Sequence, residues 1–227
     1  MKRENPQLFD ELPVAYDKWF TTSIGSLVKK YEAELILDLL KPKPSEIILD
    51  AGCGTGVFTF DILSLGSKVI GIDISLPMLV QAGKKLKGFR FPMVLAGVLK
   101  LPFPENSFDK VVLMTALEFI EDGKGAIGEL FRVTKKRGYV VVGTLNRLSP
   151  WASNRIAKAK EKHTIFEKAI FRSPDELRSL ASVEGVVKTA IFFQKGDNPE
   201  KAVGIELEGK RKNLDTGAFL AMRWEKP

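Results

Sequence analysis

Residues 47–75 combine two carboxylates with a cluster of glycines, at a spacing suited to binding a nucleoside. A first apolar run ends in Asp50 and leads into the turn 52–56 (GCGTG), and a second ends in Asp73, 21 residues after Gly52. Glycines let the backbone turn tightly and let a ligand approach closely, and the free N–H groups of a following helix favour an anionic group. A carboxylate at the position of Asp73 can accept hydrogen bonds from a ribose diol. The pattern therefore predicts a strand–helix–strand unit that binds a ribose-bearing ligand.

Three details narrow the identity of that ligand. The glycine pattern is G-x-G-x-G, and Val57 stands where a nicotinamide-dinucleotide motif would complete G-x-G-x-x-G. Asp50 would place a negative charge beside a pyrophosphate, and no Gly-Lys-Ser/Thr follows to make a nucleoside triphosphate loop. A ligand with a carboxylate for the helix end, an ammonium for Asp50 and a ribose for Asp73 satisfies all three features. S-adenosylmethionine is such a ligand, and another nucleotide bound to the same unit is the alternative.

Four motifs occur in order along the chain. They are the glycine turn Asp50–Gly56, the strand end Gly71–Ser75, the helix start Ser75–Leu79 and the stretch Leu101–Asp109 (LPFPENSFD). Together they resemble the motifs of class I S-adenosylmethionine-dependent methyltransferases, in the small-molecule type 11 branch that includes ubiquinone and menaquinone methyltransferases. The resemblance implies a Rossmann-like, doubly wound α/β sheet of seven mostly parallel strands, with an antiparallel C-terminal hairpin and an inserted helical lid. It also implies S-adenosyl-L-methionine as the cofactor.

The resemblance further implies which residues bind that cofactor. Most relatives carry an acid followed by alanine before the LPF stretch, and Gly97 and Val98 stand there in this chain. The contact of the acid with the adenine amino group is therefore absent, at a cost of about 0.5–1.5 kcal/mol for one hydrogen bond, whereas the Val98 N–H can still reach the ring. The cofactor-binding residues expected on this basis are Tyr16, Asp50, Gly52, Cys53, Gly54, Gly56, Asp73, Ile74, Met78, Gly97, Val98, Met114 and Thr115.

The sequence assigns no catalytic residue. Methyl transfer needs orientation and exclusion of water, and it needs a base only where the nucleophile must lose a proton. Glu118, His163 and Tyr16 are the candidates to test. We expect Glu118 to be a solvated loop acid and His163 to have a surface or structural role, while Tyr16 either covers the cofactor or packs in the core. Cys53 suits a small residue that fits the turn, because no histidine lies nearby in sequence to activate its thiol.

Length and composition favour a soluble globular chain. The 227 residues suit one domain with a sizeable core, and contents of 44% hydrophobic and 28% charged residues are ordinary for such a chain. No apolar run approaches the roughly 20 residues that span a bilayer, and no apolar segment follows the basic start as in a signal peptide. With a single cysteine, the chain is expected to be cytoplasmic. No metal-ligand cluster or internal repeat is visible, so we expect no metal.

We expect one methyltransferase domain over residues 1–227. Its parts are an N-terminal helical cap (1–44), a cofactor-binding core (45–145), a lid insertion (146–172) and a C-terminal helix with a hairpin (173–227). Apolar periodicity and turn residues predict helices near 27–40, 76–87 and 123–133, and a further helix that starts at Ser173. Strands are expected at 89–95, 110–117, 139–144, 186–194 and 217–224. Residues 201–216 are polar and are expected to form a long connection or a mobile flap.

The segment 145–172 is rich in basic residues with aromatic residues between them. The basic residues are Arg147, Arg155, Lys158, Lys160, Lys162, Lys168 and Arg172. A solvated helix face, a pocket for an anionic small molecule and a nucleic-acid surface are three interpretations. The +7 net charge is spread along the chain without an RNA-binding module, which makes nucleic acid the least favoured partner. We therefore predict a small-molecule acceptor. The alternatives are an RNA or protein methyltransferase and a non-catalytic adenosyl- or dinucleotide-binding protein. The sequence does not determine the oligomeric state.

Overall fold

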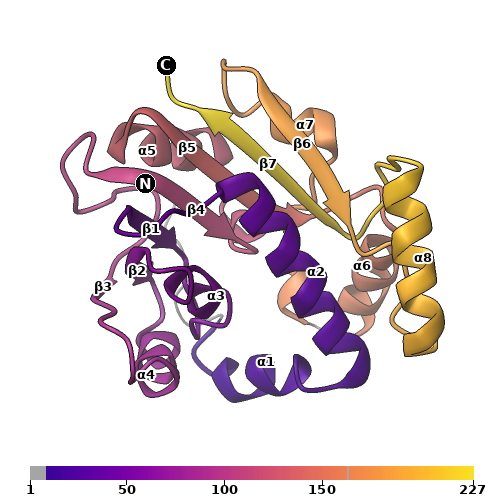
Figure 1. Cartoon of the computed structure of the whole chain (residues 1–227). Helices are drawn as coiled ribbons and strands as arrows, with labels where there is room; N and C mark the ends of the chain where they lie inside the picture. The colour runs from indigo at the N-terminus through magenta and orange to yellow at the C-terminus, as the bar shows by residue number, and fades with distance from the viewer. Residues whose placement is uncertain (1–8, 163) are drawn as a thin grey trace.

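The computed structural model describes residues 9–162 and 164–227, and its centre is a seven-stranded sheet in the order β3-β2-β1-β4-β5-β7-β6 (Figure 1). Strands β3, β2, β1, β4 and β5 pair in parallel, whereas β7 is antiparallel to both β5 and β6. This arrangement confirms the predicted fold class and its antiparallel C-terminal strands. The strands are β1 (Ile47–Ala51), β2 (Lys68–Asp73), β3 (Met93–Leu95), β4 (Phe108–Met114), β5 (Thr134–Leu145), β6 (Gly185–Ala190) and β7 (Phe219–Glu225).

Helices cover both faces of the sheet, which is why the central strands read as continuous apolar runs. Residues 111–114 of β4 and 140–145 of β5, for example, are buried throughout. The helices are α1 (Pro13–Trp19), α2 (Ser23–Leu40), α3 (Thr59–Leu63), α4 (Leu76–Lys85), α5 (Gly123–Val133), α6 (Pro150–Lys162), α7 (Pro174–Arg178) and α8 (Pro199–Arg211), with short 3-10 helices η2 (Leu117–Phe119) and η3 (Ile165–Lys168).

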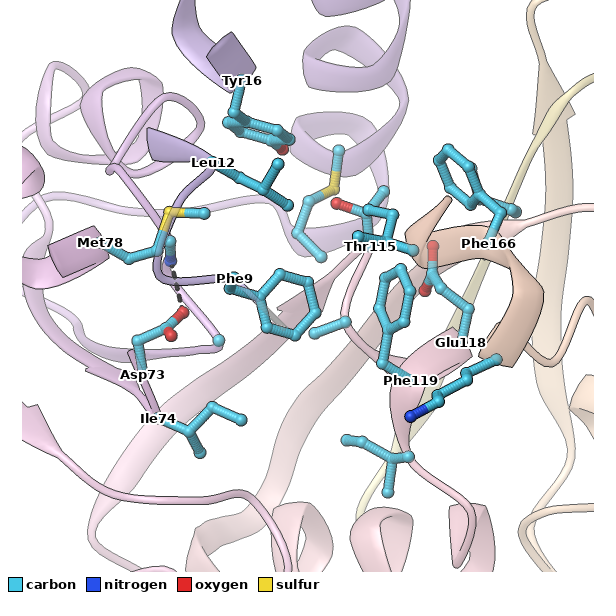
Figure 2. Close-up of a pocket in the computed structure, with 18 of the residues that line it drawn as sticks. Phe9, Leu12, Tyr16, Asp73, Ile74, Met78, Thr115, Glu118, Phe119 and Phe166 are labelled. Atoms are coloured by element: carbon cyan, nitrogen blue, oxygen red, sulfur yellow. Dashed lines mark hydrogen bonds between the residues drawn. The ribbon is translucent and has the colours of Figure 1, made fainter. Parts of the chain in front are cut away.

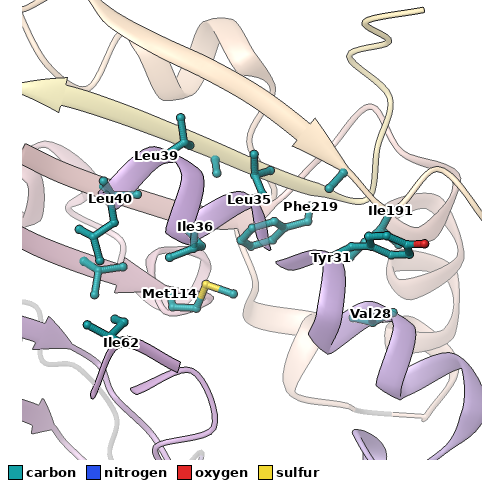
Figure 3. Close-up of a cluster of buried hydrophobic side chains, with 14 of the residues drawn as sticks. Val28, Tyr31, Leu35, Ile36, Leu39, Leu40, Ile62, Met114, Ile191 and Phe219 are labelled. Atoms are coloured by element: carbon teal, nitrogen blue, oxygen red, sulfur yellow. The ribbon is translucent and has the colours of Figure 1, made fainter. Parts of the chain in front are cut away.

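One hydrophobic core lies between α2 and the sheet. Figure 3 shows Leu35, Ile36 and Leu39 of α2 facing the strands, with Met114 and Phe219 beneath them. These α2 residues recur at the three- and four-residue spacing of one helix face, so their burial fixes α2 across the sheet. A second core lies on the other face and includes Leu130 of α5. The two cores hold the strand ends in place, and the site described below lies at those ends.

Local sequence signals set several helix boundaries. Ser75 begins α4 by accepting a hydrogen bond from the Met78 N–H. Ser173 begins α7 with a reciprocal capping box to Glu176, as the sequence pattern predicts. Lys41 adopts the left-handed conformation after α2 (φ 48°) and ends that helix. These signals act within a few residues of the helix ends, which makes them readable from the sequence.

The structure differs from the sequence-based expectations in several places. Strands β4 and β6 end at Met114 and Ala190, before the expected ends at 117 and 194, and β5 begins at Thr134 rather than at 139. Residues 199–211 form α8, where a connection or flap was expected; Ala202 and Glu206 of this helix are buried against the rest of the fold. The third strand covers only Met93–Leu95, because β3 is an edge strand that pairs with β2 alone. The predicted strand–helix–strand unit is present, and its helix α3 has five residues (Thr59–Leu63). None of the helices in the described residues is long and apolar enough to cross a membrane.

Candidate cofactor and acceptor site

A cavity of about 1200 Å³ lies beyond the carboxyl ends of β1, β2 and β4 and is lined by Asp50, Asp73 and Met114 from those strands. Ligands of open α/β sheets bind at this edge. Figure 2 shows two sides of the cavity: Asp73, Ile74 and Met78 lie on one, and Glu118, Phe119 and Phe166 lie on the other. Phe9, Leu12 and Tyr16 from the N-terminal segment also line it. The cavity therefore has a cofactor side, built by the expected motifs, and a second side that those motifs do not build.

The glycine turn adopts backbone conformations that favour glycine. Gly52, Gly54 and Gly56 have φ values of 73°, 52° and 74°, in the left-handed region. A Cβ on Gly54 would meet no protein atom within 4 Å, and Gly54 lines the cavity, so this position leaves room for a ligand. A Cβ on Gly56 would lie 2.8 Å from the Leu86 Cδ1. Gly56 therefore serves helix packing.

Asp73 lies at the end of β2 with unused capacity to accept hydrogen bonds. Its Oδ2 accepts from the Gly54 N–H at 2.8 Å and its Oδ1 from the Ser75 N–H at 2.9 Å. Burial raises the pKa of Asp73, while these backbone hydrogen bonds act in the opposite direction. A carboxylate offers about four lone-pair sites, so both oxygens can still accept from a ribose diol. The side chain thus fits the role that the motif implies.

Asp50 at the end of β1 is fully buried next to the cavity. Its Oδ2 accepts from the Thr59 hydroxyl at 2.6 Å. Burial raises the pKa of Asp50 to about 6, and the Asp73 charge raises it further against the effect of the Thr59 hydrogen bond. A bound cation would favour the ionised form of such a carboxyl. The environment of Asp50 therefore fits the ammonium group of S-adenosylmethionine.

The cavity brings together most of the residues that the resemblance implies. Gly56 and Gly97 are not among its lining residues. Thr115, at the end of β4, has a positive φ of 45°, a strained backbone of the kind found at functional sites. The expected residues that do line the cavity are Tyr16, Asp50, Gly52, Cys53, Gly54, Asp73, Ile74, Met78, Val98, Met114 and Thr115.

Helix α1 covers the cavity with aromatic side chains. The Tyr16 ring packs edge-to-face on Phe20 at 5.1 Å between centroids, and Phe20 packs in the same way on Phe58 at 5.7 Å. All three rings also line the cavity. Tyr16 therefore both packs against neighbouring rings and lies where it can cover a ligand, which are the two alternatives that the sequence left open. Burial raises the pKa of Tyr16 well above its ordinary value, as do the charges of Glu32 and Glu118. The Tyr16 hydroxyl is therefore neutral near pH 7.

Cys53 is buried within the glycine turn. Burial raises the pKa of its thiol well above the ordinary value, and the charges of Asp50 and Asp73 raise it further. A thiol with a raised pKa is a poor nucleophile. The structure thus supports the interpretation of Cys53 as a small residue that fits the turn.

The expectation that Glu118 is a solvated loop acid was wrong. Its side chain is fully buried and lines the cavity. The reason is the 3-10 turn η2 after β4, which Arg172 holds in place by donating to the carbonyls of Leu117 (2.9 Å) and Ile120 (3.3 Å). Burial raises the pKa of Glu118 to about 7, against the lowering effect of a hydrogen bond from Thr144 and of two arginines.

Sequence reasoning missed a second buried acid, Glu32 of α2. It is 5% exposed and lines the cavity. Burial raises its pKa to about 8, with Arg155 acting to lower it and Glu118 to raise it. The signal in the sequence was its position: Glu32 lies four residues from Val28 and four from Ile36, within the apolar face of the helix. An acid in that stripe must be buried.

The basic residues of the lid fall into separate groups. The Arg155 guanidinium lies over the rings of Trp151 and Phe166, at 5.1 and 5.2 Å from their centroids, and lines the cavity. Lys158 and Lys168 line it too but are exposed. Arg147 pairs with Glu176 at 2.7 Å. The lid is therefore only partly a solvated basic face. His163 lies outside the described residues, among which no cluster of metal-binding side chains occurs.

Comparison with known proteins agrees with this geometry. A family model described as a methyltransferase domain matches residues 49–142. A demethylmenaquinone methyltransferase of Corynebacterium efficiens is 32% identical over 187 residues, which cover 74% of this chain and 78% of that protein. An uncharacterized protein of Methanocaldococcus jannaschii is 30% identical over 224 residues, covering 96% of this chain and 98% of that protein. Four other demethylmenaquinone methyltransferases are matched over only 56–59% of their own length.

A solved structure shows the same fold over nearly the whole chain. It is that of an S-adenosylmethionine-dependent methyltransferase from Thermotoga maritima, described as a possible histamine N-methyltransferase. The TM-score is 0.71 at 24% identity, over 98% of this chain and 99% of that one. From its motifs, sheet and relatives, the chain belongs to the type 11 branch of the class I methyltransferases, and its cofactor is S-adenosylmethionine.

Proposed function

We propose that this methyltransferase acts on a small molecule that binds in the cavity beside Thr115. The observation that carries the proposal is the cavity volume of about 1200 Å³. A site for one drug-sized ligand occupies roughly 300–1000 Å³, so the cavity has room for the cofactor and for a second small molecule. The aromatic side chains of Phe119 and Phe166 line the part that the cofactor motifs leave free, which suits an acceptor with an apolar body.

The cofactor-binding residues follow from the positions of the motifs. Asp73 would hold the ribose and Asp50 the ammonium group, with the backbone of the glycine turn at the carboxylate. Ile74 and Met78 would pack against the adenosine, and Val98 would offer its N–H to the adenine ring. Met114 and Thr115 would flank the sulfonium. Tyr16 would cover it.

When bound, S-adenosylmethionine supplies an activated methyl group. The contribution of the chain is to orient the acceptor in line with that group and to exclude water. Residues of helix α1 and the side chains of Trp151 and Phe166 line the cavity and would exclude water from it. Met114 and Thr115, which would flank the sulfonium, carry no charge. The sulfonium loses its positive charge as the methyl group leaves, so a negative group there would stabilise the ground state more than the transition state.

The buried carboxylates of the cavity favour a small acceptor over RNA. Two exposed basic residues, Lys158 and Lys168, line the cavity. The buried groups that line it include two carboxylates, Glu32 and Glu118. Phosphate groups would be repelled by those acids when they are ionised. A nucleic-acid methyltransferase would bind with a steep salt dependence, and a small neutral or cationic acceptor would not.

The test has two stages. Calorimetric titration with S-adenosylmethionine, S-adenosylhomocysteine and NAD, with Asp73→Ala as the control, should show micromolar binding of the two adenosyl ligands only, lost in the variant. Methyl-labelled cofactor is then incubated with a cell extract separated into small molecules, RNA and protein. Label in the small-molecule fraction alone is the expected result. Label in RNA or protein alone would overturn the proposal.

A further inference from the structure

Glu118 presents an unpaired oxygen to the cavity. Its Oε2 accepts a hydrogen bond from the Thr144 hydroxyl at 3.2 Å, but its buried Oε1 has no hydrogen-bond partner among the described residues. Figure 2 shows the carboxylate beside Thr115 and Phe166. A fully buried acceptor without a donor is unfavourable, and such groups in native proteins call for a donor from a ligand or a bound molecule. The side chain is therefore built to receive an N–H or O–H group.

Glu32 brings a second carboxylate to the same space from another element. Glu32 lies on α2 and is 5% exposed. Its charge raises the pKa of Tyr16, as the charge of Glu118 does. The charges of Glu32 and Glu118 also act on one another. No hydrogen bond is made to the Glu32 carboxylate within the described part of the chain. Two acids from distant parts of the sequence thus line one cavity, and Thr144 is the one described side chain that donates a hydrogen bond to either of them.

The two arginines whose charges act on these acids make their own contacts with other groups. Arg155 acts on both acids, yet its guanidinium is stacked on Trp151 and Phe166. Arg172 acts on Glu118, but it donates to the carbonyls of Leu117, Ile120 and Ile170. A cation entering the cavity would allow both acids to ionise, since an opposite charge nearby favours the charged form.

Aromatic rings complete the surroundings of these acids. Phe119 contacts Phe9 edge-to-face at 5.0 Å between centroids, and Phe166 lies 6.4 Å from Phe119. These three side chains line the cavity. The faces of aromatic rings attract cations, and more strongly where water is excluded. Carboxylates and aromatic rings are the groups that attract an organic ammonium ion.

We propose that the methyl acceptor is a protonated primary or secondary amine with an apolar body, that Glu118 and Glu32 hold its ammonium group, and that Glu118 takes the proton before the nitrogen is methylated. The inference rests on the proposed function and names the class of acceptor. A carboxylate or phosphate acceptor would be repelled by the two acids in their ionised forms, and a neutral alcohol would bring no charge that favours their ionisation. One interpretation of the basic residues at 145–172 was a pocket for an anionic small molecule, whereas the buried acids favour a cation.

Methylation of the amine nitrogen balances in protons and electrons. The ammonium group R–NH₃⁺ gives one proton to the Glu118 carboxylate and becomes R–NH₂. The nitrogen lone pair forms a bond to the methyl carbon as the carbon–sulfur bond breaks, and the bonding pair stays on sulfur. The products are R–NH₂⁺–CH₃ and S-adenosylhomocysteine. The proton on Glu118 passes to water when the product leaves, so no oxidant, reductant or metal takes part.

The protonation states of Glu118 and Glu32 before binding predict that protons are released when an ammonium ion binds. Glu118 (pKa about 7) and Glu32 (pKa about 8) are partly or mostly protonated at pH 7 in the free site. The groups that face them are Tyr16 of α1, Thr144 of β5, Arg155 of α6 and Arg172. A bound ammonium ion lowers the pKa of both acids, so about one proton is released to the buffer at pH 7.

The experiment is calorimetry on protein saturated with S-adenosylhomocysteine. The probes are benzylamine, 2-phenylethylamine and 3-phenylpropylamine, each with its alcohol and carboxylate of the same skeleton. Titrations in phosphate and in Tris at pH 7 separate proton release from the heat of binding. At least one amine should bind tenfold or more tightly than its alcohol and carboxylate, with net proton release. Incubation with S-adenosylmethionine should then add one methyl group to its nitrogen, detected by mass.

Matched variants test the two acids. Glu118→Gln and Glu32→Gln should each weaken amine binding at least tenfold and reduce proton release, while leaving affinity for S-adenosylhomocysteine within about twofold, which shows that they fold. Glu34→Gln on the same helix is the control, since Glu34 is exposed and pairs with Lys30 and Lys210; it should behave like the wild type.

Several results would overturn the proposal. They are tighter binding of an alcohol or carboxylate than of every amine, amine binding that Glu118→Gln does not weaken, and the absence of amine binding in protein that binds S-adenosylhomocysteine. Failure to bind S-adenosylhomocysteine would instead contradict the proposed function. The two failures are therefore distinguishable.

Discussion

Asp17 of α1 accepts a 2.6 Å hydrogen bond from the hydroxyl of Thr55 in the glycine turn. The same carboxylate accepts from Lys85 at 2.6 Å and from Gln81 at 3.1 Å, both on α4. Burial acts to raise the pKa of Asp17, but these hydrogen bonds and the Lys85 charge outweigh it and hold the pKa below its ordinary value. One acid thus fastens α1, which covers the cavity, to two elements of the cofactor side.

We expect Asp17→Ala to release the cofactor product faster. Helix α1 must move for a ligand to leave the covered site, and the variant removes the contacts that hold it down. Because Asp17 and Lys85 are partly exposed, the loss is on the order of 1 kcal/mol, or about fivefold in dissociation rate. Stopped-flow displacement of S-adenosylhomocysteine measures it. Asp38→Ala, which removes an exposed acid paired with Lys188, is the control. An unchanged dissociation rate would show that α1 does not gate release.

Substitution by alanine should lower cofactor affinity at Gly54 and folding stability at Gly56. Gly54→Ala adds a methyl group that meets no protein atom but faces the cavity, so affinity for S-adenosylhomocysteine should fall at least tenfold. Gly56→Ala places its methyl 2.8 Å from Leu86, so it should lower the free energy of unfolding by about 2 kcal/mol or more. Chemical denaturation and calorimetry on both variants check this. Equal losses of affinity in the two variants would contradict the division of roles.

Glu32 should make folding stability depend on pH in an unusual direction. The pKa of Glu32 is raised from 4.5 to about 8 by burial, so the unfolded chain binds fewer protons than the folded one between these values. Stability is therefore lost as pH rises from about 4.5 to about 8 and then levels off. Glu32→Gln removes this penalty, and its stability relative to wild type should rise by on the order of 3 kcal/mol from pH 5 to pH 9. Thermal denaturation at several pH values measures the difference. Glu34→Gln, at an exposed position of the same helix, is the control.

Cys53 should be inert in the folded protein. Burial raises the pKa of its thiol, and only the thiolate reacts rapidly with alkylating agents. Iodoacetamide at pH 8 should therefore modify native protein at least a hundredfold more slowly than protein in denaturant, as followed by mass spectrometry. Cys53→Ala should still bind S-adenosylhomocysteine within about threefold of wild type. Rapid alkylation of native protein would show that the turn opens.

Features that depend on neighbouring residues could be predicted well. The strand–turn–helix at Asp50 to Gly56, the capping box of Ser173 and Glu176, and helix α5 at Gly123–Val133 all rest on interactions within a few residues. The short edge strand β3 and helix α8 were harder. The length of β3 depends on its single partner, β2, and α8 is polar along much of its length and is fixed by burying residues such as Ala202.

The sequence by itself determined the strand–helix–strand unit and the cofactor motifs with their order, because glycine turns, strand patterns and the Asp73 spacing can be read along the chain. The seven-stranded sheet was implied by the resemblance to the family. Only the tertiary structure decided the acceptor side. Glu32, Glu118 and Arg155 come from α2, η2 and α6, separated by tens of residues, and no local pattern relates them. Their protonation depends on burial, and burial depends on the packing of α1, α2 and the lid around one cavity. The sequence thus identified the methyl donor, and the fold points to the kind of acceptor.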